Sequence, residues 1–280
     1  MNIKLYQCFH DRGSFPKEKY LSELRPALLC GTDIEWRDNK DIQNCLKDNI
    51  GNNISIENTQ YSELTGYYWI WKNQPTVDII GIEHYRRHFI KHNINIDNYV
   101  KPEDLITEND IITLLDKYQF ILPVPEGLWN TSVYDLYVIC FNEQAKDIMK
   151  YMKKYYIETK QDNYLNAVYT YMANNTLYRA NMLITTQKEF NHYCEEMFKL
   201  LDYIKQNMEV KPDSRIWGYI SELFPAIYII ANNKTFTEVD IAVDDFNLDL
   251  QKEIVVTTIN NCEGEHKNNS LKQIEFFKSL

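Results

Sequence analysis

Short runs of apolar residues predict buried strands in the first half of the chain. Such runs at residues 3–9, 77–82 and 118–123 have strand length and end at polar residues or prolines. Between the first two, residues 57–72 carry aromatic and aliphatic side chains at helical spacing, which predicts one helix that Pro75 cannot continue. Strands that alternate with helices are typical of α/β folds.

Helical periodicity dominates the second half of the chain. Residues 134–171 and 188–206 predict long helices, and residues 215–230 predict another that Pro225 kinks or divides. The remaining predicted elements are a helix from Thr107 to Leu115, a short strand at 181–185 and a last strand at 236–243. We therefore expect an α/β fold, a single Rossmann-type domain with a mostly parallel central sheet and a more helical C-terminal half.

The chain shows neither an internal repeat nor a low-complexity linker, so we expect one domain over residues 1–260. Residues 261–280 form a tail that begins polar and ends with apolar residues at helical spacing. Such an amphipathic tail docks on its own domain, pairs subunits or contacts a membrane surface. Docking is the commonest of these outcomes, and an acidic protein is not attracted to anionic lipid.

Composition and charge exclude several classes of protein. With 44% hydrophobic and 25% charged residues among 280, the chain has the make-up of a soluble globular protein. Its net charge of −10 argues against a broad nucleic-acid-binding surface, so any anionic ligand needs a local group of cations. Aromatic residues make up 14%, which suits binding of sugars and nucleobases but also follows from codon bias in an AT-rich genome.

Cysteines and targeting signals indicate a cytoplasmic protein. The six cysteines show no C-x-x-C pairing, which favours neither a disulfide framework nor a zinc site. The N-terminus lacks the charged-then-apolar pattern of a signal peptide, and no apolar run approaches the length of a membrane span. We expect the protein in the cytoplasm, with peripheral contact to the inner face of the cell membrane left open. Its oligomeric state stays open too.

A cationic group stands where the predicted strand at 77–82 ends. His84, Arg86, Arg87 and His88 follow that strand directly. Ligands of open α/β sheets bind just beyond the carboxyl ends of the strands, and guanidinium groups suit phosphate oxygens. Such a group can neutralise a diphosphate without a metal. A structural ion pair, for example with Glu83 or Asp78, would use the same residues without any ligand.

Two carboxylates are candidates for the chemistry of the site. Glu63 lies in the aromatic helix predicted at 57–72, where it can bind sugar hydroxyls, pair with Arg86 or stay exposed. Glu222 follows Arg215 by two helical turns, and a carboxylate placed to take a proton from an acceptor hydroxyl would act as a general base. Pairing of Arg215 with Glu222 on a helix surface is the alternative.

Five blocks of sequence resemble a known family. Residues 48–58 contain Gly51-Asn52-Asn53-Ile54-Ser55, and residues 61–73 read Y-S-E-L-T…Y-W-I-W-K-N. Residues 78–87 read D-I-I-G-I-E-H-Y-R-R, and the later blocks are Tyr178 to Met182 and R-I-W-G-Y-I-S-E at 215–222. Together they resemble the DUF4422 family of glycosyltransferases for capsular or exopolysaccharide synthesis. Ser62 stands where that family usually has Cys, and residues 134–140 lack an expected His.

The resemblance implies a GT-A-like fold that binds a nucleotide-sugar, with residues 1–125 as the donor half and 126–260 as the acceptor half. It assigns donor binding to Phe9, His10, Gly31, Asn53, Asn58, Tyr61, His84, Tyr85, Arg86 and Arg87. We further assign acceptor or sugar binding to Trp129, Asn181, Arg215 and Trp217, and catalysis to Glu222, Glu63 and His84.

The expected activity is hexosyl transfer from a nucleotide-sugar, a UDP-sugar above all, to a growing surface polysaccharide or lipid-linked oligosaccharide. We assign no metal ligands, because the Asp-x-Asp sequence that holds Mn²⁺ or Mg²⁺ in usual GT-A enzymes is absent from the strand end at His84, so metal dependence stays open. A phosphotransferase is disfavoured, since no Gly-x-x-x-x-Gly-Lys loop occurs. The alternative function is a non-catalytic sugar- or nucleotide-binding component of a polysaccharide assembly complex.

Overall fold

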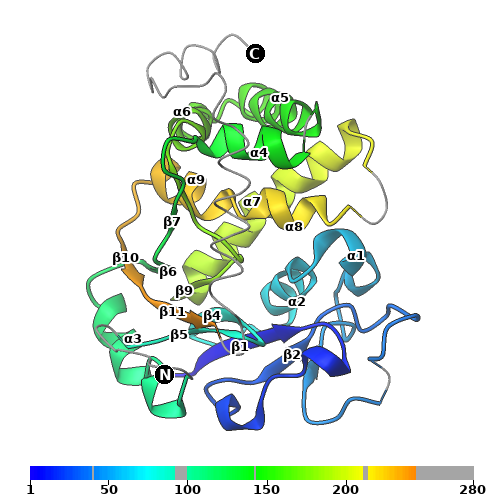
Figure 1. The fold of residues 1–280 in the computed structure, drawn as a ribbon, viewed down its shortest axis with the longest axis vertical. Coiled ribbons are helices and arrows are strands. Elements are labelled where there is room, and N and C mark those ends of the chain that lie inside the picture. Colours follow the sequence, from blue (N-terminus) through cyan, green and yellow to red (C-terminus); the bar gives the residue numbers. More distant parts are fainter. Residues whose placement is uncertain (40, 92–99, 142, 211–213, 244–280) are drawn as a thin grey trace.

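A mixed β-sheet with helices on both faces forms the centre of the protein (Figure 1). The computed structural model describes residues 1–39, 41–91, 100–141, 143–210 and 214–243. The sheet has the order β10-β6-β9-β4-β1-β2-β3. These strands are Phe236–Val239, Phe120–Pro123, Leu183–Thr186, Ile79–His84, Ile3–Phe9, Ala27–Leu29 and Leu46–Lys47. The fold class predicted from sequence is confirmed.

Parallel pairing joins the strands on each side of one antiparallel strand. β1 pairs in parallel with β4 and β2, β2 with β3, and β6 with β10. Strand β9 runs antiparallel between β4 and β6. A short antiparallel extension, β5 (Arg87–Phe89) and β11 (Ile241–Val243), continues from the end of β4. A separate ribbon pairs β7 (Glu126–Gly127) with β8 (Thr176–Leu177).

Alternate residues of the central strands enter two different cores. In β1, Tyr6 and Cys8 belong to the large core on one side, whereas Ile3 and Leu5 belong to the smaller core on the other side. Because side chains of a strand alternate between faces, a strand buried on both sides reads as a continuous apolar run. This explains why apolar residues occupy both faces of the strand at residues 3–9, where only Lys4 and Gln7 are polar.

The helices divide between the two faces and the second half of the chain. Helices α2 (Leu64–Asn73) and α7 (Gln187–Asn207) cover the face with the large core, and α3 (Glu108–Leu115) packs against β6 and β9. The remaining helices are α1 (Asn58–Tyr61), α4 (Val133–Phe141), α5 (Glu143–Glu158), α6 (Asp162–Met172), α8 (Ile216–Ser221) and α9 (Phe224–Ala231). Short 3₁₀ turns occur at Arg12–Ser14, Glu18–Tyr20, Ser55–Glu57 and Pro102–Asp104. The more helical second half is confirmed.

Two predicted helices are each interrupted. The helix expected over residues 57–72 breaks at Ser62, which has φ 50° and ψ −132°, so α1 and α2 are separate. The helix expected over 215–230 divides into α8 and α9, with Pro225 in the first turn of α9, where a missing N–H costs nothing. Both interruptions border the cavity described below.

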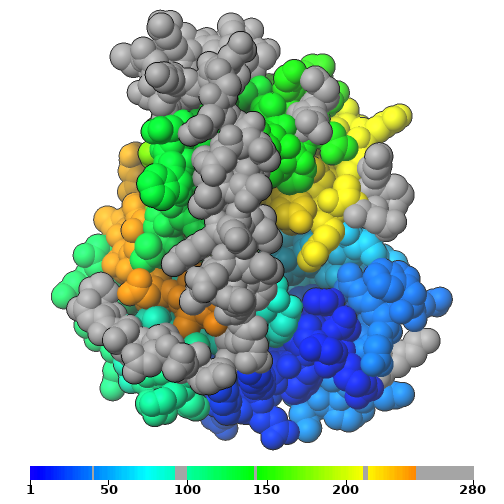
Figure 2. Space-filling model, in the orientation of Figure 1, coloured from blue at the N-terminus to red at the C-terminus, as the bar shows by residue number. Residues whose placement is uncertain are grey.

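The space-filling view shows the blue and cyan N-terminal residues in the lower part of one face and the bright green and yellow helical residues above them (Figure 2). Strands β9 and β10 nevertheless join the same sheet as β1 and β4, so the expected donor and acceptor halves share one sheet. The amphipathic tail predicted at 261–280 lies outside the described residues. Within the described chain, none of the helices has the length and apolar character required to span a membrane.

Candidate active site

A large cavity lies at the carboxyl ends of β1, β2 and β4. Its volume is about 1190 Å³, and its wall includes residues from these strand ends, from the α1–α2 junction, from α4 and from α8. The parallel register places Cys8 of β1 beside His84 of β4, so both strands end at the same edge. This is the edge where open α/β sheets bind their ligands.

The cationic sequence after β4 forms a tight turn at the cavity. Strand β4 ends at His84 and β5 begins at Arg87, so Tyr85 and Arg86 form the turn between them. All four side chains contribute to the cavity wall. The Arg86 guanidinium carbon lies 5.3 Å from the centre of the Tyr85 ring, at a distance typical of cation–π contact.

His88 and Glu83 do not reach the cavity, although they belong to the same cationic sequence. Both are fully buried behind the turn, where Glu83 Oε2 accepts a hydrogen bond of 3.2 Å from Arg25 Nε. Glu83 Oε1 accepts a second one of 2.9 Å from the backbone N–H of Phe89. Burial alone would raise the pKa of Glu83, but Arg25, His88 and the Phe89 N–H hold that pKa below its ordinary value. This ion pair fixes the turn that presents Arg86.

Further cations meet at the end of the cavity near β1. His10 follows β1, Arg37 comes from the loop after β2, and Arg215 precedes α8. Burial lowers the pKa of His10, an effect that Asp11 opposes and that the charges of Arg37 and Arg215 reinforce. Burial and Arg215 likewise lower the pKa of Arg37. The charges that lower the pKa of His10 and Arg37 lie close to them, and an anion bound among these cations would be stabilised.

Two hydrogen bonds hold these arginines. The Arg37 guanidinium donates to the side-chain oxygen of Asn58, and Arg215 Nε donates to Ser62 Oγ at 3.1 Å. Gly218 permits the second contact, because a Cβ at that position would lie 3.2 Å from Ser62 Cβ. The interruption at Ser62 therefore helps to form the cavity wall, because α1 packs against α8 there.

Glu63 and Glu222 both face the cavity, each held by one strong hydrogen bond. Asn181 Nδ2 donates to Glu63 Oε1 at 2.6 Å, and the backbone N–H of Ala180 donates to Glu222 Oε1 at 2.9 Å. Burial raises the pKa of Glu222 to about 7; the Ala180 N–H opposes this shift and the nearby charge of Glu63 adds to it. A carboxyl with a pKa near 7 can accept or donate a proton at physiological pH.

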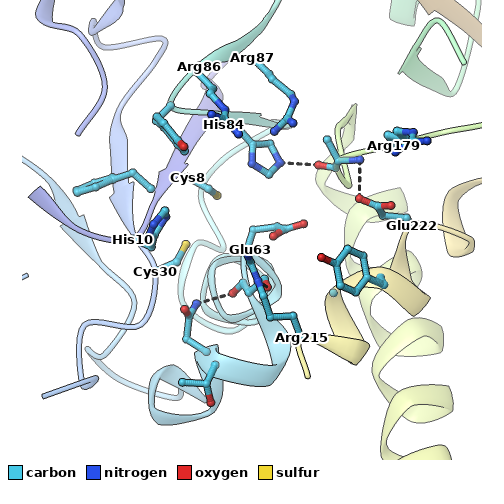
Figure 3. A pocket seen from close by; sticks show the side chains of 18 of the residues that line it. Cys8, His10, Cys30, Glu63, His84, Arg86, Arg87, Arg179, Arg215 and Glu222 are labelled. Carbon is cyan, nitrogen blue, oxygen red and sulfur yellow. Dashed lines mark hydrogen bonds between the residues drawn. The ribbon is translucent and has the colours of Figure 1, made fainter. Parts of the chain in front are cut away.

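The backbone N–H and C=O of Ala180 link Glu222 to His84 (Figure 3). His84 Nε2 lies 2.5 Å from the Ala180 carbonyl oxygen. A carbonyl only accepts, so this nitrogen carries the proton when the ring is neutral. Burial lowers the pKa of His84, although Glu63 opposes this shift. Ala180 and Asn181 have φ of 70° and 48°, a left-handed conformation that is uncommon for residues with side chains, and the N–H and C=O of Ala180 contact Glu222 and His84.

Ten of the residues selected from sequence belong to the cavity wall: Phe9, His10, Asn58, Glu63, His84, Tyr85, Arg86, Arg87, Arg215 and Glu222. They come from the strand ends, the α1–α2 junction and α8. The structure thus brings together the two carboxylates and the adjacent arginines, which lie far apart in the sequence. Their roles stay predictions.

The other selected residues stand behind the wall or away from it. Asn181 is buried and holds Glu63, while the rings of Tyr61 and Trp217 pack together in the core at 6.1 Å. Gly31 has φ 77° and packs against the Asn58 side chain. Asn53 donates hydrogen bonds within its own loop, to the carbonyls of residues 49 and 51. Trp129 is 73% exposed and does not line the cavity.

Sequence reasoning missed several residues of the wall, among them Trp36, Arg37, Tyr137, Phe141, Arg179 and Tyr219. Tyr137, Phe141 and Tyr219 form a connected aromatic group, with ring centres 5.4 and 5.2 Å apart. Their spacing fits an ordinary amphipathic helix, so it carried no functional signal. Trp36 and Arg37 lie in a polar loop without periodicity. Only their residue types, an aromatic ring and a cation, could have indicated a role in binding.

The profile of a known family, described as a domain of unknown function (DUF4422), matches residues 4–234. The chain belongs to the DUF4422 family. The matched range contains all the residues that line the cavity except Ile241 and Val243, which belong to β11. The family's description states no activity, so the residues of the cavity are the basis for inferring the chemistry of this DUF4422 protein.

One solved structure, described as the WbbM bifunctional glycosyltransferase in its apo form, has a similar fold. The two superpose with a TM-score of 0.73 at 23% sequence identity, over 88% of this chain and 46% of the other. The DUF4422 chain thus spans about half the length of that protein, and at this identity the likeness concerns the fold. A search of curated proteins found no match.

Proposed function

We propose that this DUF4422 protein is a glycosyltransferase that moves a hexose-type sugar from a nucleotide-sugar, with a UDP-sugar as the expected donor. The observation that carries the proposal is one cavity with a cluster of cations at one end and a carboxyl of pKa about 7 at the other. The likeness in fold to a bifunctional glycosyltransferase supports it. The acceptor would be a growing surface polysaccharide or a lipid-linked oligosaccharide.

The cations would bind the diphosphate of the donor. The charges of Arg37, Arg215 and Arg86 all lower the pKa of His10, and the charge of Arg215 lowers that of Arg37. Fixed cations stabilise the negative charge that develops on the leaving nucleoside diphosphate. Among the described residues, no three His, Cys, Asp or Glu side chains gather as a metal site would need. These cations would supply at least part of the compensation that a divalent metal gives in other enzymes.

The carboxylates would act on the sugar and the acceptor. Ionised Glu222 would take the proton of an acceptor hydroxyl while that oxygen attacks the anomeric carbon, and the bond from that carbon to the diphosphate oxygen would break. A single displacement of this kind inverts the anomeric centre. Glu63, held by Asn181, would bind sugar hydroxyls. Neutral His84 would position Glu222 through the Ala180 peptide.

A panel of nucleotide-sugars tests the proposal. Purified protein is mixed with UDP-, GDP-, dTDP- and CMP-sugars, with Mn²⁺ or with EDTA, and thermal stabilisation and slow hydrolysis of the donor are followed. Stabilisation and cleavage with one nucleotide class would support a transferase. Stabilisation without cleavage, unchanged when Glu63 or Glu222 is replaced, would indicate the alternative, a non-catalytic binding component. No response to any donor would refute both.

The double variant Arg86→Ala/Arg87→Ala is expected to lose at least about 10²-fold in kcat/KM, because each replaced cation would otherwise stabilise the leaving diphosphate. The measurement is donor turnover in EDTA, where the unmodified protein should keep its activity. Arg12→Ala is the matched control, since Arg12 lies outside the cavity wall and pairs with Asp38 at the surface. Full activity of the double variant in EDTA would contradict the role assigned to these arginines.

A further inference from the structure

We propose that Trp36 is the stacking platform for the nucleobase of the donor. This inference rests on the proposed function and adds a binding site for one part of the donor. Trp36 lies in the loop between β2 and β3. Its side chain is 75% exposed, although it belongs to the cavity wall. A large aromatic ring left so open at a cavity is an unused apolar surface.

One face of the Trp36 ring is already covered by a cation. The guanidinium carbon of Arg37 lies 5.2 Å from the ring centre, within the range of a cation–π contact. Arg37 is in turn fixed by its hydrogen bond to Asn58. Asn39 closes the same loop by donating to the carbonyl of Gly31 at 2.9 Å. Trp36 therefore has a supported face and a free face, as a stacking platform requires.

The order of groups along the cavity matches the order of parts in a nucleotide-sugar. In Figure 3, His10 and Cys30 lie on one side, Glu222 and Arg179 lie on the opposite side, and Glu63 lies between them. Arg37 donates to Asn58, whose side chain packs against Gly31 next to Cys30, and its charge lowers the pKa of His10. Arg37 and its neighbour Trp36 therefore belong to the His10 end. With the diphosphate among the cations and the sugar toward Glu63 and Glu222, the base is the part that reaches Trp36.

An acceptor sugar has a different aromatic surface available to it. Phe141 and the 40% exposed Tyr219 line the cavity at its carboxylate end. The Tyr219 carbonyl accepts a hydrogen bond of 3.2 Å from the Glu222 N–H, and the Phe141 ring packs against the Tyr219 ring. Trp36 lies at the opposite end, where an acceptor bound to it could not present its hydroxyl to Glu222. The flat face of Trp36 also suits the flat face of a nucleobase better than the puckered ring of a sugar. Stacking on such a ring tolerates any base, so specificity for one base has to come from other contacts.

The test compares binding of UDP with binding of inorganic pyrophosphate by isothermal calorimetry. Trp36→Ala is expected to weaken UDP binding by roughly tenfold or more, the usual loss when a base loses its aromatic partner. Pyrophosphate has no base, so its affinity should not change. Trp36→Phe keeps a ring and should retain most of the UDP affinity. Binding of UDP should also quench tryptophan fluorescence in the unmodified protein, and Trp36→Phe should remove most of that quenching.

Trp71→Phe is the matched control for fluorescence and binding, because Trp71 also has a neighbouring cation over its ring, Lys72 at 3.2 Å, but lies outside the cavity wall. Its quenching by UDP and its UDP affinity should equal those of the unmodified protein. Equal UDP affinity in Trp36→Ala and the unmodified protein would overturn the inference alone. Equal losses for UDP and pyrophosphate would also overturn it, since Trp36 would then only support the loop. If the unmodified protein bound no nucleotide at all, the proposed function would fail first.

Discussion

Replacement of Glu222 by Gln is expected to lower kcat by about 10²- to 10⁴-fold and to leave UDP affinity nearly unchanged. This range is the usual contribution of a positioned general base. Gln keeps the shape of the side chain and still offers an oxygen to the Ala180 N–H, so only the ability to take a proton is lost. Turnover of donor and acceptor gives kcat, and calorimetry with UDP gives the affinity. Unchanged turnover would exclude Glu222 as the base.

The pH dependence of kcat/KM tests the same role independently. A base has to be ionised, so activity should rise with pH through about 7, the pKa of Glu222, and level off above it. Glu222→Gln should lose this acid limb, whatever activity remains. An acid limb at the same pH in Glu222→Gln would assign the titration to another group.

Glu222→Gln is also expected to stabilise the folded protein at pH 8. Burial raises the pKa of Glu222 in the folded state, so an unfolded chain ionises this carboxyl at lower pH than the folded chain. The stability of the unmodified protein therefore falls between about pH 4.5 and pH 7, and Gln avoids this loss. Thermal melts should show a higher Tm for Glu222→Gln at pH 8 and equal Tm values near pH 4. A lower Tm at pH 8 would mean that the charged form is stabilised by contacts that Gln cannot make.

Replacement of Glu83 by Gln is expected to lower the free energy of unfolding by about 3–5 kcal/mol, which is the usual cost of removing one partner of a buried ion pair. The change leaves the buried Arg25 guanidinium without its counter-charge. Urea unfolding should show a lower midpoint with an unchanged slope. The double variant Arg25→Met/Glu83→Leu removes both charges and should recover much of the loss.

Lys154→Ala provides the matched control for the buried pair. Lys154 and Glu158 form an exposed pair one helical turn apart, at 3.7 Å, and such pairs contribute less than about 1 kcal/mol. The buried pair also predicts acid sensitivity. Because the pKa of Glu83 is held below its ordinary value, its contribution is complete above that value and is lost as pH falls through the lowered pKa. Equal effects of Glu83→Gln and Lys154→Ala would show that burial adds nothing to this pair.

Local patterns were sufficient for most of the fold. Strands predicted at residues 3–9, 77–82, 118–123 and 181–185 correspond to β1, β4, β6 and β9, and the helix with its Thr107 cap corresponds to α3. Apolar runs, helical spacing and caps are properties of neighbouring residues, so they can be recognised without knowledge of the rest of the chain. The cationic turn after β4 was predicted for the same reason: it directly follows a strand end.

The break at Ser62 carried no such local signal. Its positive φ is unusual for a residue with a side chain, and it is held by tertiary contacts, since Asn58 donates to its carbonyl and Arg215 to its hydroxyl. The sequence around it has uninterrupted helical spacing. The sequence alone therefore predicts α1 and α2 as one helix with Glu63 inside it, whereas Glu63 is the residue directly before α2.

The sequence by itself determined the α/β class, the main strands and helices, and the candidate groups Glu63, Arg86, Arg87 and Glu222. Only the tertiary structure decided which of the charged residues face the cavity. It turned Glu83 and His88 away to a buried pair with Arg25, and it brought in Trp36 and Arg37 from a loop without periodicity. The physical reason is that side-chain direction at a turn and the meeting of distant segments depend on strand order and packing, which no local pattern encodes.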